Sequence, residues 1–402
     1  MIKRIQSEQL KPGMFIHDLN YCWMDHPLMF NALKISDEDT IAKILSCGIR
    51  ELYIDTGKGL DMPDAPTQEE LNAELHGQIT SVVENYTKKS INTVSLIDEI
   101  VIAKRLRSEA SQIVHNFMSE TRMGNPICAE DATPVVELVF DSIMRNQNAF
   151  ISLSRIKNID EYTYHHSLSV CALLIAFSLE IEYEKEVVLE AGLGGLLHDV
   201  CKMKVPDKIL NKPGSLTESE FVAVKSHSTL GRELLMQISG IPDTAIIITD
   251  QHHERYDGSG YPNRIKQDEI SQLGQMASIV DVYDALTSDR VYHKGMEPTA
   301  ALGKLLEWSK FNFNPHLVET FICMIGIYPV GTLVRLESGM LGVVVDPGRE
   351  NLLRPTVRAV FDTIRDFAVS PRDIDLSLQL EECIVGYESP QKWGISPFSY
   401  FN

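Results

Sequence analysis

The sequence lacks the patterns that place a chain in a membrane, on duplex nucleic acid or in a disulfide framework. No apolar run reaches the roughly 18 residues of a membrane span, and the segment MIKRIQSEQLKPGMF has no apolar core of signal-peptide length. The seven cysteines are odd in number and form no CxxC pair, which argues against disulfides and a thiolate zinc site. Only 37 basic residues oppose 56 acidic ones, and the net charge of -19 repels duplex nucleic acid and anionic membranes. We therefore expect a cytoplasmic chain with no membrane insertion and no duplex nucleic acid as partner.

The composition is that of a globular protein with several domains. Hydrophobic residues make up 44% of the 402 residues and charged residues 23%, and this length suits two or three domains. The spacing of apolar residues predicts a mainly α fold. In chain order we expect a small α/β N-terminal domain, a helical linker or regulatory segment, a large helical domain and a short β-rich C-terminal extension, at residues 1–66, 67–125, 126–327 and 328–402.

Local patterns support this division. KPGMFIHDL and RELYIDT predict strands, and SDEDTIAKILSCGI predicts a capped helix that ends at Gly48. From Gln68 to about Arg122 the apolar residues recur at helical spacing, which predicts one or two long amphipathic helices that could form a dimer seam. The longest apolar run, at residues 170–178, suits a buried helix, and short β-branched runs after Pro329 predict a small sheet.

Histidine is the most informative residue type in this sequence. Seven of the twelve histidines fall between His165 and His293, and most of them stand beside Asp, Glu or another His. Imidazole and carboxylate together suit zinc, iron, manganese or nickel, and the absence of cysteine pairs argues against a structural thiolate zinc. This clustering indicates a metal site.

The pair His198-Asp199 follows an apolar helical run. Adjacent helix residues diverge by about 100°, so the two side chains do not easily chelate one ion, but the carboxylate can bridge to a second. The alternative is a buried histidine beside a capping Asp, because this dipeptide arises by chance in many chains of this length. His227 lies alone on a predicted helix, where a histidine is more often structural than a ligand.

Two further segments favour metal binding. His252 and His253 stand side by side, Glu254 can orient an imidazole, and DGSGYP makes a tight turn. Asp281 lies amid the apolar positions of a predicted helix, where a buried carboxylate needs a cation, hydrogen bonds or a metal. For Asp284 we favour an ordinary helix acid whose hydrogen bonds are satisfied.

In their order and spacing these residues resemble the HD-GYP domains of the HD phosphohydrolase superfamily. The resemblance rests on the order H…HD…H…HH…D, on HDVCKMKVPDKILNKPGSLT, on HHERYDGSGYP and on DALTSDRVY. It covers roughly residues 130–325 and implies an HD-type helical catalytic domain. The first sixty residues, with LKPGMFIHDLNYCWMDHP and LYIDTGKG, resemble a small domain that often precedes HD-GYP domains in bacteria.

The resemblance implies an enzyme that hydrolyses cyclic di-GMP to pGpG with a hydroxide held by two divalent metals. Such an arrangement of two metals is suited to in-line displacement at phosphorus. Iron or manganese is favoured, with nickel, magnesium or zinc as alternatives. Where some members carry an extra Glu ligand for a third metal this chain has Tyr162, so we expect a binuclear site and a product that stops mainly at pGpG. The residues that match the metal ligands are His166, His198, Asp199, His227, His252, His253 and Asp281, with Asp199 bridging.

The resemblance also implies substrate contacts. Lys202 matches a lysine that contacts the phosphate and stabilises developing charge, which makes it catalytic together with Asp199. Arg290 matches an arginine that grips the second phosphate. His293 and Lys294 stand where many members have a further basic contact, which would make that grip depend on pH through His293. The residues expected to surround the metal ligands, or to form the loop beside them, are Glu254, Asp257, Gly258, Gly260, Tyr261 and Pro262.

Several alternatives stay open at this point. The same chemistry could act on 3'3'-cyclic GMP-AMP, because nothing in the motifs reads the base. A different class of function is a non-catalytic receptor for a cyclic dinucleotide, or a module that binds a GGDEF-type protein through the GYP loop. A third is the broader HD activity on other phosphoesters, and a homodimer through the helices of residues 67–125 is a further expectation.

Overall fold

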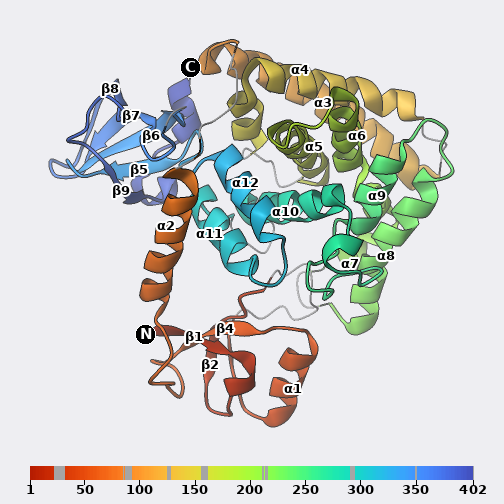
Figure 1. Cartoon of the computed structure of the whole chain (residues 1–402), viewed down its shortest axis with the longest axis horizontal. Helices are drawn as coiled ribbons and strands as arrows, with labels where there is room; N and C mark the ends of the chain where they lie inside the picture. Colours follow the sequence, from red (N-terminus) through yellow and green to blue (C-terminus); the bar gives the residue numbers. More distant parts are fainter. Residues whose placement is uncertain are drawn as a thin grey trace.

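The computed structural model describes residues 1–21, 32–84, 86, 93–124, 128–154, 162–210, 212, 216–289, 295–348 and 351–401. Figure 1 shows three parts: a small N-terminal sheet at the bottom, a large helical body, and a second sheet at the upper left. Helix α2 (Gln68–Glu84) runs from the N-terminal sheet along the side of the body toward the second sheet. This arrangement confirms the mainly α fold with a small sheet toward each end of the chain.

The N-terminal sheet is antiparallel, with the strand order β1-β4-β2-β3. Its elements are β1 (Ile2–Gln6), the 3-10 helix η1 (Ser7–Gln9), β2 (Phe15–Asp18), β3 (Leu33–Lys34), α1 (Glu38–Ser46) and β4 (Glu51–Asp55). Helix α1 packs on the sheet, because its Ile41 and Ile44 belong to the same buried cluster as the strands. Asp37 caps the start of α1, and Gly48 follows its end in a left-handed conformation with φ 78°. The capped helix and the two strands predicted for this region are confirmed.

Ten of the described α-helices, α3 to α12, form the helical body. They are α3 (Leu96–Met123), α4 (Ala129–Ser154), α5 (Tyr162–Glu180), α6 (Lys185–Leu197), α7 (Asp207–Leu210), α8 (Glu218–Leu235), α9 (Asp243–Gln251), α10 (Gln272–Thr287), α11 (Pro298–Trp308) and α12 (Pro315–Ile325), with 3-10 helices η4 (Val200–Lys204) and η5 (Gln267–Glu269). The long helices predicted for residues 68–122 are α2 and α3. In the described part of the chain, no helix is long and apolar enough to cross a membrane.

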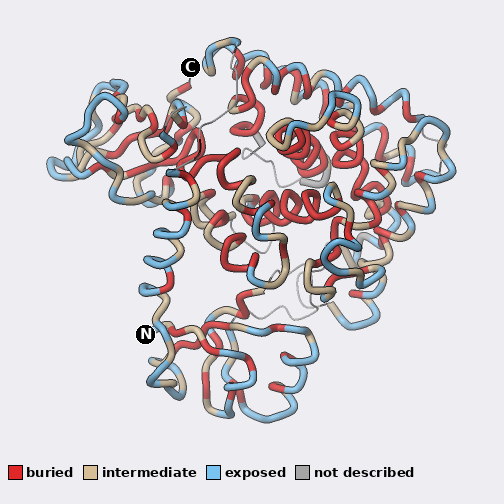
Figure 2. The backbone as a smooth tube through the Cα atoms, in the orientation of Figure 1, coloured by how far each residue is buried: buried red, intermediate tan, exposed pale blue. Residues whose placement is uncertain are grey.

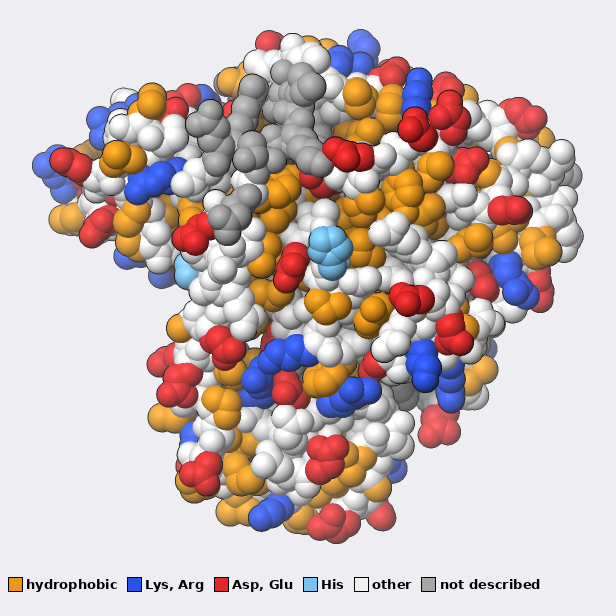
Figure 3. All heavy atoms as spheres, viewed as in Figure 1, with side chains coloured by type: hydrophobic (Ala, Val, Ile, Leu, Met, Phe, Trp, Pro, Cys, Tyr) orange, Lys and Arg blue, Asp and Glu red, His pale blue; other side chains and the backbone are white. Residues whose placement is uncertain are grey.

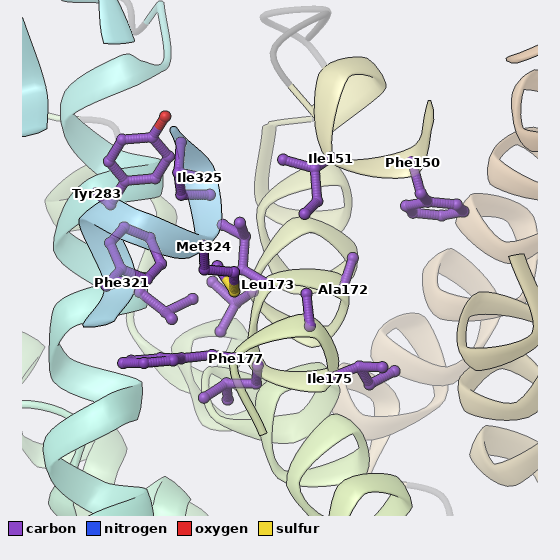
Figure 4. Close-up of a cluster of buried hydrophobic side chains, with 14 of the residues drawn as sticks. Phe150, Ile151, Ala172, Leu173, Ile175, Phe177, Tyr283, Phe321, Met324 and Ile325 are labelled. Carbon is purple, nitrogen blue, oxygen red and sulfur yellow. The ribbon is translucent and has the colours of Figure 1, made fainter. Parts of the chain in front are cut away.

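Helix α5 lies in the interior of this body, and Figure 2 shows its buried course. Residues 170–177 are each at most 1% exposed, so the longest apolar run of the sequence forms a core helix. Figure 4 shows Phe177 of α5 facing Phe321 of α12, with ring centroids 5.3 Å apart, and Tyr283 of α10 packs on the same Phe321 ring at 5.1 Å. These contacts fix α5 against α10 and α12.

The second sheet is antiparallel, with the order β8-β7-β6-β5-β9. Its elements are β5 (Leu333–Leu336), β6 (Met340–Asp346), β7 (Thr356–Asp362), β8 (Phe367–Asp375) and β9 (Ile384–Tyr387), followed by α13 (Pro390–Trp393) and η6 (Pro397–Phe401). Val343 and Val357 of this sheet belong to the buried cluster of the helical body, so the two share one hydrophobic core. The N-terminal sheet and α1, which we call the N-terminal unit, have a core of their own.

Candidate metal centre

The seven side chains predicted as metal ligands converge inside the helical body, and each residue is at most 2% exposed. They come from α5, α8 and α10 and from the C-terminal ends of α6 and α9. Two groups of ligand atoms, each within 4.8 Å of one another, are formed by His166, His198 and Asp199, and by Asp199, His227, His252 and His253. Asp281 adjoins the first group, because its Oδ1 lies 3.0 Å from His166 Nε2.

Asp199 lies between the two groups and turns one carboxylate oxygen toward each. Its Oδ2 is 3.2 Å from His198 Nε2 and 3.6 Å from His166 Nε2. Its Oδ1 is 3.3 Å from His227 Nε2 and 3.7 Å from His252 Nε2. One carboxylate thus faces both groups, and the bridging role of Asp199 stays a prediction that this placement supports.

A helix end explains how the neighbours His198 and Asp199 both face the centre. The sequence argument placed the pair at the end of a helical run and noted that adjacent residues on a helix diverge by about 100°. In the structure His198 is the C-cap of α6, and Asp199 has φ -103° and ψ 11°, outside the helix. Gly195 lets α6 approach α5 closely, because a Cβ there would lie 3.0 Å from the backbone nitrogen of Cys171. The end of helix α6 at His198 and the close packing of α6 on α5 together bring the two side chains to the centre.

Three of the imidazoles are oriented by their own helices. Nδ1 of His198, His227 and His252 lies 2.7, 2.6 and 2.8 Å from the carbonyl oxygen three residues earlier. A carbonyl only accepts, so Nδ1 carries a proton, and in the neutral ring Nε2 presents a bare lone pair to the centre. The Nε2 atoms of His227 and His252 are 3.3 Å apart. Two lone pairs at that distance repel one another, and a cation between them relieves the repulsion.

His166 is oriented by a different helix. Its Nδ1 donates to Asp284 Oδ2 at 2.6 Å, which turns Nε2 toward Asp281 and to within 3.3 Å of His198 Nε2. The sequence argument favoured an ordinary helix acid at Asp284 and missed this contact. The available signal was spacing: three residues after Asp281, the side chain lies on the same face of α10. Such a carboxylate fixes the ring and raises its basicity as a ligand.

Buried atoms without hydrogen bonds test whether a metal fits. Within the described residues, neither ring nitrogen of His253 has a hydrogen-bond partner, and neither has Asp199 Oδ1. A buried polar atom left without a partner costs about 1–3 kcal/mol. Coordination of a cation would satisfy Asp199 Oδ1 and one ring nitrogen of His253, and these imidazole and carboxylate donors suit divalent metals such as iron, manganese or zinc. The residues present therefore fit divalent metal.

The electrostatics of the centre keep its carboxylates ionised and most of its imidazoles neutral. Burial lowers the pKa of His227 to about 4, and burial together with the neighbouring His198 lowers the pKa of His252 well below its usual value. Burial alone would raise the pKa of Asp199, but His198 and Lys202 outweigh it and hold that pKa well below the usual range. His198 is the exception: burial alone would lower its pKa, but Asp199 and Asp281 outweigh burial and raise it, so this ring must lose a proton when it binds a metal. Neutral imidazole beside ionised carboxylate is the form in which these side chains bind metals.

Lys202 reaches the centre from the more exposed side. Its ammonium donates to Asp199 Oδ2 at 2.6 Å, and its side chain is 16% exposed, whereas the side chain of Asp199 is 1% exposed. Lys202 is thus a partly exposed cation in direct contact with the buried Asp199 carboxylate, and its predicted contact with a substrate phosphate stays a prediction.

The segment after His253, residues 256–263, is here called the GYP loop, and it packs directly on this ligand. The Tyr261 ring stacks on the His253 ring with centroids 4.5 Å apart, and its backbone N–H donates to the His253 carbonyl at 3.1 Å. A Cβ at Gly260 would lie 2.5 Å from that carbonyl oxygen, so glycine permits the contact. Glu254 Oε1 accepts hydrogen bonds from the backbone N–H groups of residues 263 and 264, next to Pro262. Glu254 therefore shapes the end of the loop, and the imidazole-orienting role that the sequence suggested for it stays a prediction.

Some predicted positions lie outside the described residues. They are Arg290, His293 and Lys294, and the side chain of Tyr162. The substrate contacts assigned to the first three, and the argument from Tyr162 for two ions, stay predictions.

Two family models match successive parts of the chain, and the first spans both the N-terminal unit and the helices α2 and α3 that follow it. A model of a domain of unknown function (DUF3391) matches residues 2–132, and a model of the HD domain matches residues 139–317. The cyclic di-GMP phosphodiesterase PA4108 of Pseudomonas aeruginosa is 39% identical over 395 residues, which are 98% of this chain and 94% of PA4108.

Two further similarities are partial or distant. The 3'3'-cGAMP-specific phosphodiesterase 1 of Vibrio cholerae is 36% identical over 34% of this chain and 31% of its own length. The solved structure of Bd1817, described as an HDG"Y"P protein from Bdellovibrio bacteriovorus, is 18% identical with a TM-score of 0.47, over 80% of this chain and 98% of that one.

Proposed function

The chain belongs to the HD-GYP family of phosphodiesterases, and on that basis we propose that it hydrolyses cyclic di-GMP to the linear dinucleotide pGpG. The choice of substrate is supported by PA4108, a relative matched over nearly its whole length and named a cyclic di-GMP phosphodiesterase. The relatives named for 3'3'-cGAMP match only about a third of this chain. Hydrolysis of 3'3'-cyclic GMP-AMP by the same chemistry is the alternative.

The observation that carries the proposal is the convergence of bare imidazole lone pairs on the two oxygens of one buried carboxylate. We assign two divalent ions to the two groups that share Asp199, with Asp281 completing the group of His166 and His198. When bound, such a pair of ions supplies an activated water nucleophile and neutralises the phosphodiester. Iron or manganese is the favoured metal for this mixture of imidazole and carboxylate.

The side chains of this protein supply orientation and a local positive charge. Asp199 holds the two groups at a fixed separation, because its oxygens face opposite sets of imidazoles. Lys202 brings an ammonium to the solvent side of the centre in a protein whose net charge of -19 would otherwise repel a dinucleotide. There it can bind a substrate phosphate and stabilise the charge that develops as the ester bond breaks.

A parallel turnover assay tests this proposal. The purified full-length protein is loaded with Mn²⁺ or Fe²⁺, its metal content is measured, and the same sample is given cyclic di-GMP and 3'3'-cyclic GMP-AMP in separate reactions. We expect linear pGpG as the product, with turnover lost in Asp199→Ala and kept in His316→Ala, which removes an exposed histidine of α12.

Two outcomes would overturn the assignment in different ways. Faster turnover of 3'3'-cyclic GMP-AMP than of cyclic di-GMP would replace the substrate and keep the chemistry. A metal-loaded protein that binds a cyclic dinucleotide and hydrolyses none would support the non-catalytic receptor.

A further inference from the structure

The N-terminal unit is held on the helical body by a buried polar cluster. Glu307 of α11 accepts hydrogen bonds from Tyr53 Oη at 2.7 Å and from Asn20 Nδ2 at 2.9 Å. The Asn20 Oδ1 atom accepts in turn from Lys304 Nζ at 2.7 Å and Trp308 Nε1 at 3.0 Å. Figure 3 shows basic and acidic side chains side by side where the lower N-terminal unit meets the body. A buried network of this kind specifies one docked position, because any shift leaves its members without partners.

A second contact joins the N-terminal unit to the GYP loop. Arg50 Nη2 lies 2.9 Å from Asp257 Oδ2, and the same guanidinium stands 4.6 Å from the centroid of the Phe311 ring. Nearby, Tyr21 Oη and Ser259 Oγ are 3.4 Å apart. The N-terminal part of the chain, which contributes no metal ligand, thus contacts two residues of the loop, Asp257 and Ser259.

The loop carries this contact to the metal centre through short hydrogen bonds. Asp257 Oδ1 accepts the backbone N–H of Ser259 at 3.0 Å and its hydroxyl at 2.6 Å, around Gly258 with φ 80°. The carboxylate that binds Arg50 therefore also closes the turn. Four residues after Asp257, Tyr261 stacks on the His253 ring, and its backbone N–H donates to the His253 carbonyl.

His253 depends on this support more than the other histidines of its group. His227 and His252 are oriented by carbonyls of their own helices. Within the described residues, neither ring nitrogen of His253 has a hydrogen-bond partner, and the stacked Tyr261 ring restricts its rotation from outside the histidine cluster.

We infer that Arg50 is a positioning residue of the metal centre, which holds the GYP loop against His253 through Asp257. The inference rests on the metal centre proposed above and gives the N-terminal unit a role in the reaction. The ion pair between Arg50 and Asp257 contributes modestly, since the Arg50 side chain is 48% exposed. We therefore expect its removal to weaken the positioning of the loop and not to abolish it. A ligand or partner that binds Arg50 in place of Asp257 would weaken the packing of the GYP loop on His253.

Hydrogen exchange of the full-length protein tests the inference without substrate. Peptides that cover residues 256–264 report the backbone N–H groups bonded to His253 and Glu254. In Arg50→Ala we expect these amides to exchange about two- to fivefold faster, with a partial return in Arg50→Lys. The matched control is Lys43→Ala, which removes a cation from the exposed face of α1 in the same unit and should leave the loop unchanged.

The second readout is Mn²⁺ affinity by calorimetry, with kcat and KM measured on the same variants. Arg50→Ala should bind Mn²⁺ about two- to fivefold more weakly and lose kcat in proportion, with KM little changed. Loop exchange equal to that of Lys43→Ala would refute the inference, and so would faster exchange with unchanged Mn²⁺ affinity. If exchange and affinity change as expected in a protein that hydrolyses no cyclic dinucleotide, the proposed function fails and this inference stands.

Discussion

Replacing Asp284 by alanine should weaken metal binding at the His166 side of the centre. The bond from His166 Nδ1 to Asp284 Oδ2 is 2.6 Å long, and both side chains are 2% exposed. Its loss strands a buried N–H, at a cost of about 1–3 kcal/mol, which corresponds to about 5- to 150-fold in a binding constant. Partners that orient metal-bound histidines contribute about 10- to 100-fold in affinity or activity. We therefore expect Mn²⁺ affinity to fall by about 10- to 100-fold.

Calorimetric titration of chelator-treated protein with Mn²⁺ measures this effect. Asp284→Asn keeps an acceptor but loses the charge, and a charge-assisted bond is about twice as strong as a neutral one, so its loss of affinity should be intermediate. Glu99→Gln is the matched control: Glu99 is fully buried and binds Ser142 and Arg145, away from the centre, so it should lower thermal stability and leave Mn²⁺ affinity unchanged. Unchanged affinity in folded Asp284→Ala would refute the reasoning.

Three other predictions concern the centre as a whole. Asp199→Asn should empty both groups, because one carboxylate serves each, and elemental analysis would contradict this by finding wild-type metal content. Lys202→Ala should keep its metal and lose about 10²- to 10³-fold in kcat, and a loss of metal in place of turnover would assign the ammonium a purely structural role. Removal of metal by a chelator should lower the unfolding temperature, since a ligand at 100 times its Kd stabilises by about 2.7 kcal/mol, and added Mn²⁺ should restore it.

Much of the fold follows from local patterns that a single sequence displays. The apolar run at residues 170–178 can only be satisfied in a core, and it forms the buried α5. The capped helix α1 carries its own start and stop residues, Asp37 and Gly48. The separate core of the N-terminal unit and the shared core of the helical body and second sheet were beyond such reasoning, because they depend on which surfaces meet.

The metal centre, too, was predictable from the sequence only in part. Its ligands form an ordered motif that is readable in sequence, whereas the contact of Asp284 with His166 spans 118 positions and appears only when α5 and α10 pack. The pair Arg50 and Asp257 is separated by 207 positions and joins two parts of the chain that have separate hydrophobic cores. Neither residue lies in a chemical motif that includes its partner, so nothing in the order of residues marks the pair.

The orientation of the metal ligands comes from two sources, and they respond differently to change. Three imidazoles are fixed by carbonyls of their own helices, so they keep their direction as long as each helix exists. His166 is held by Asp284 of α10, and His253 by the Tyr261 ring of the GYP loop, both of which are tertiary contacts. A shift in packing that leaves every helix intact therefore acts on the centre at His166 and His253. Since the N-terminal unit touches the loop that holds His253, that side of the centre is the one at which the rest of the chain can alter its geometry.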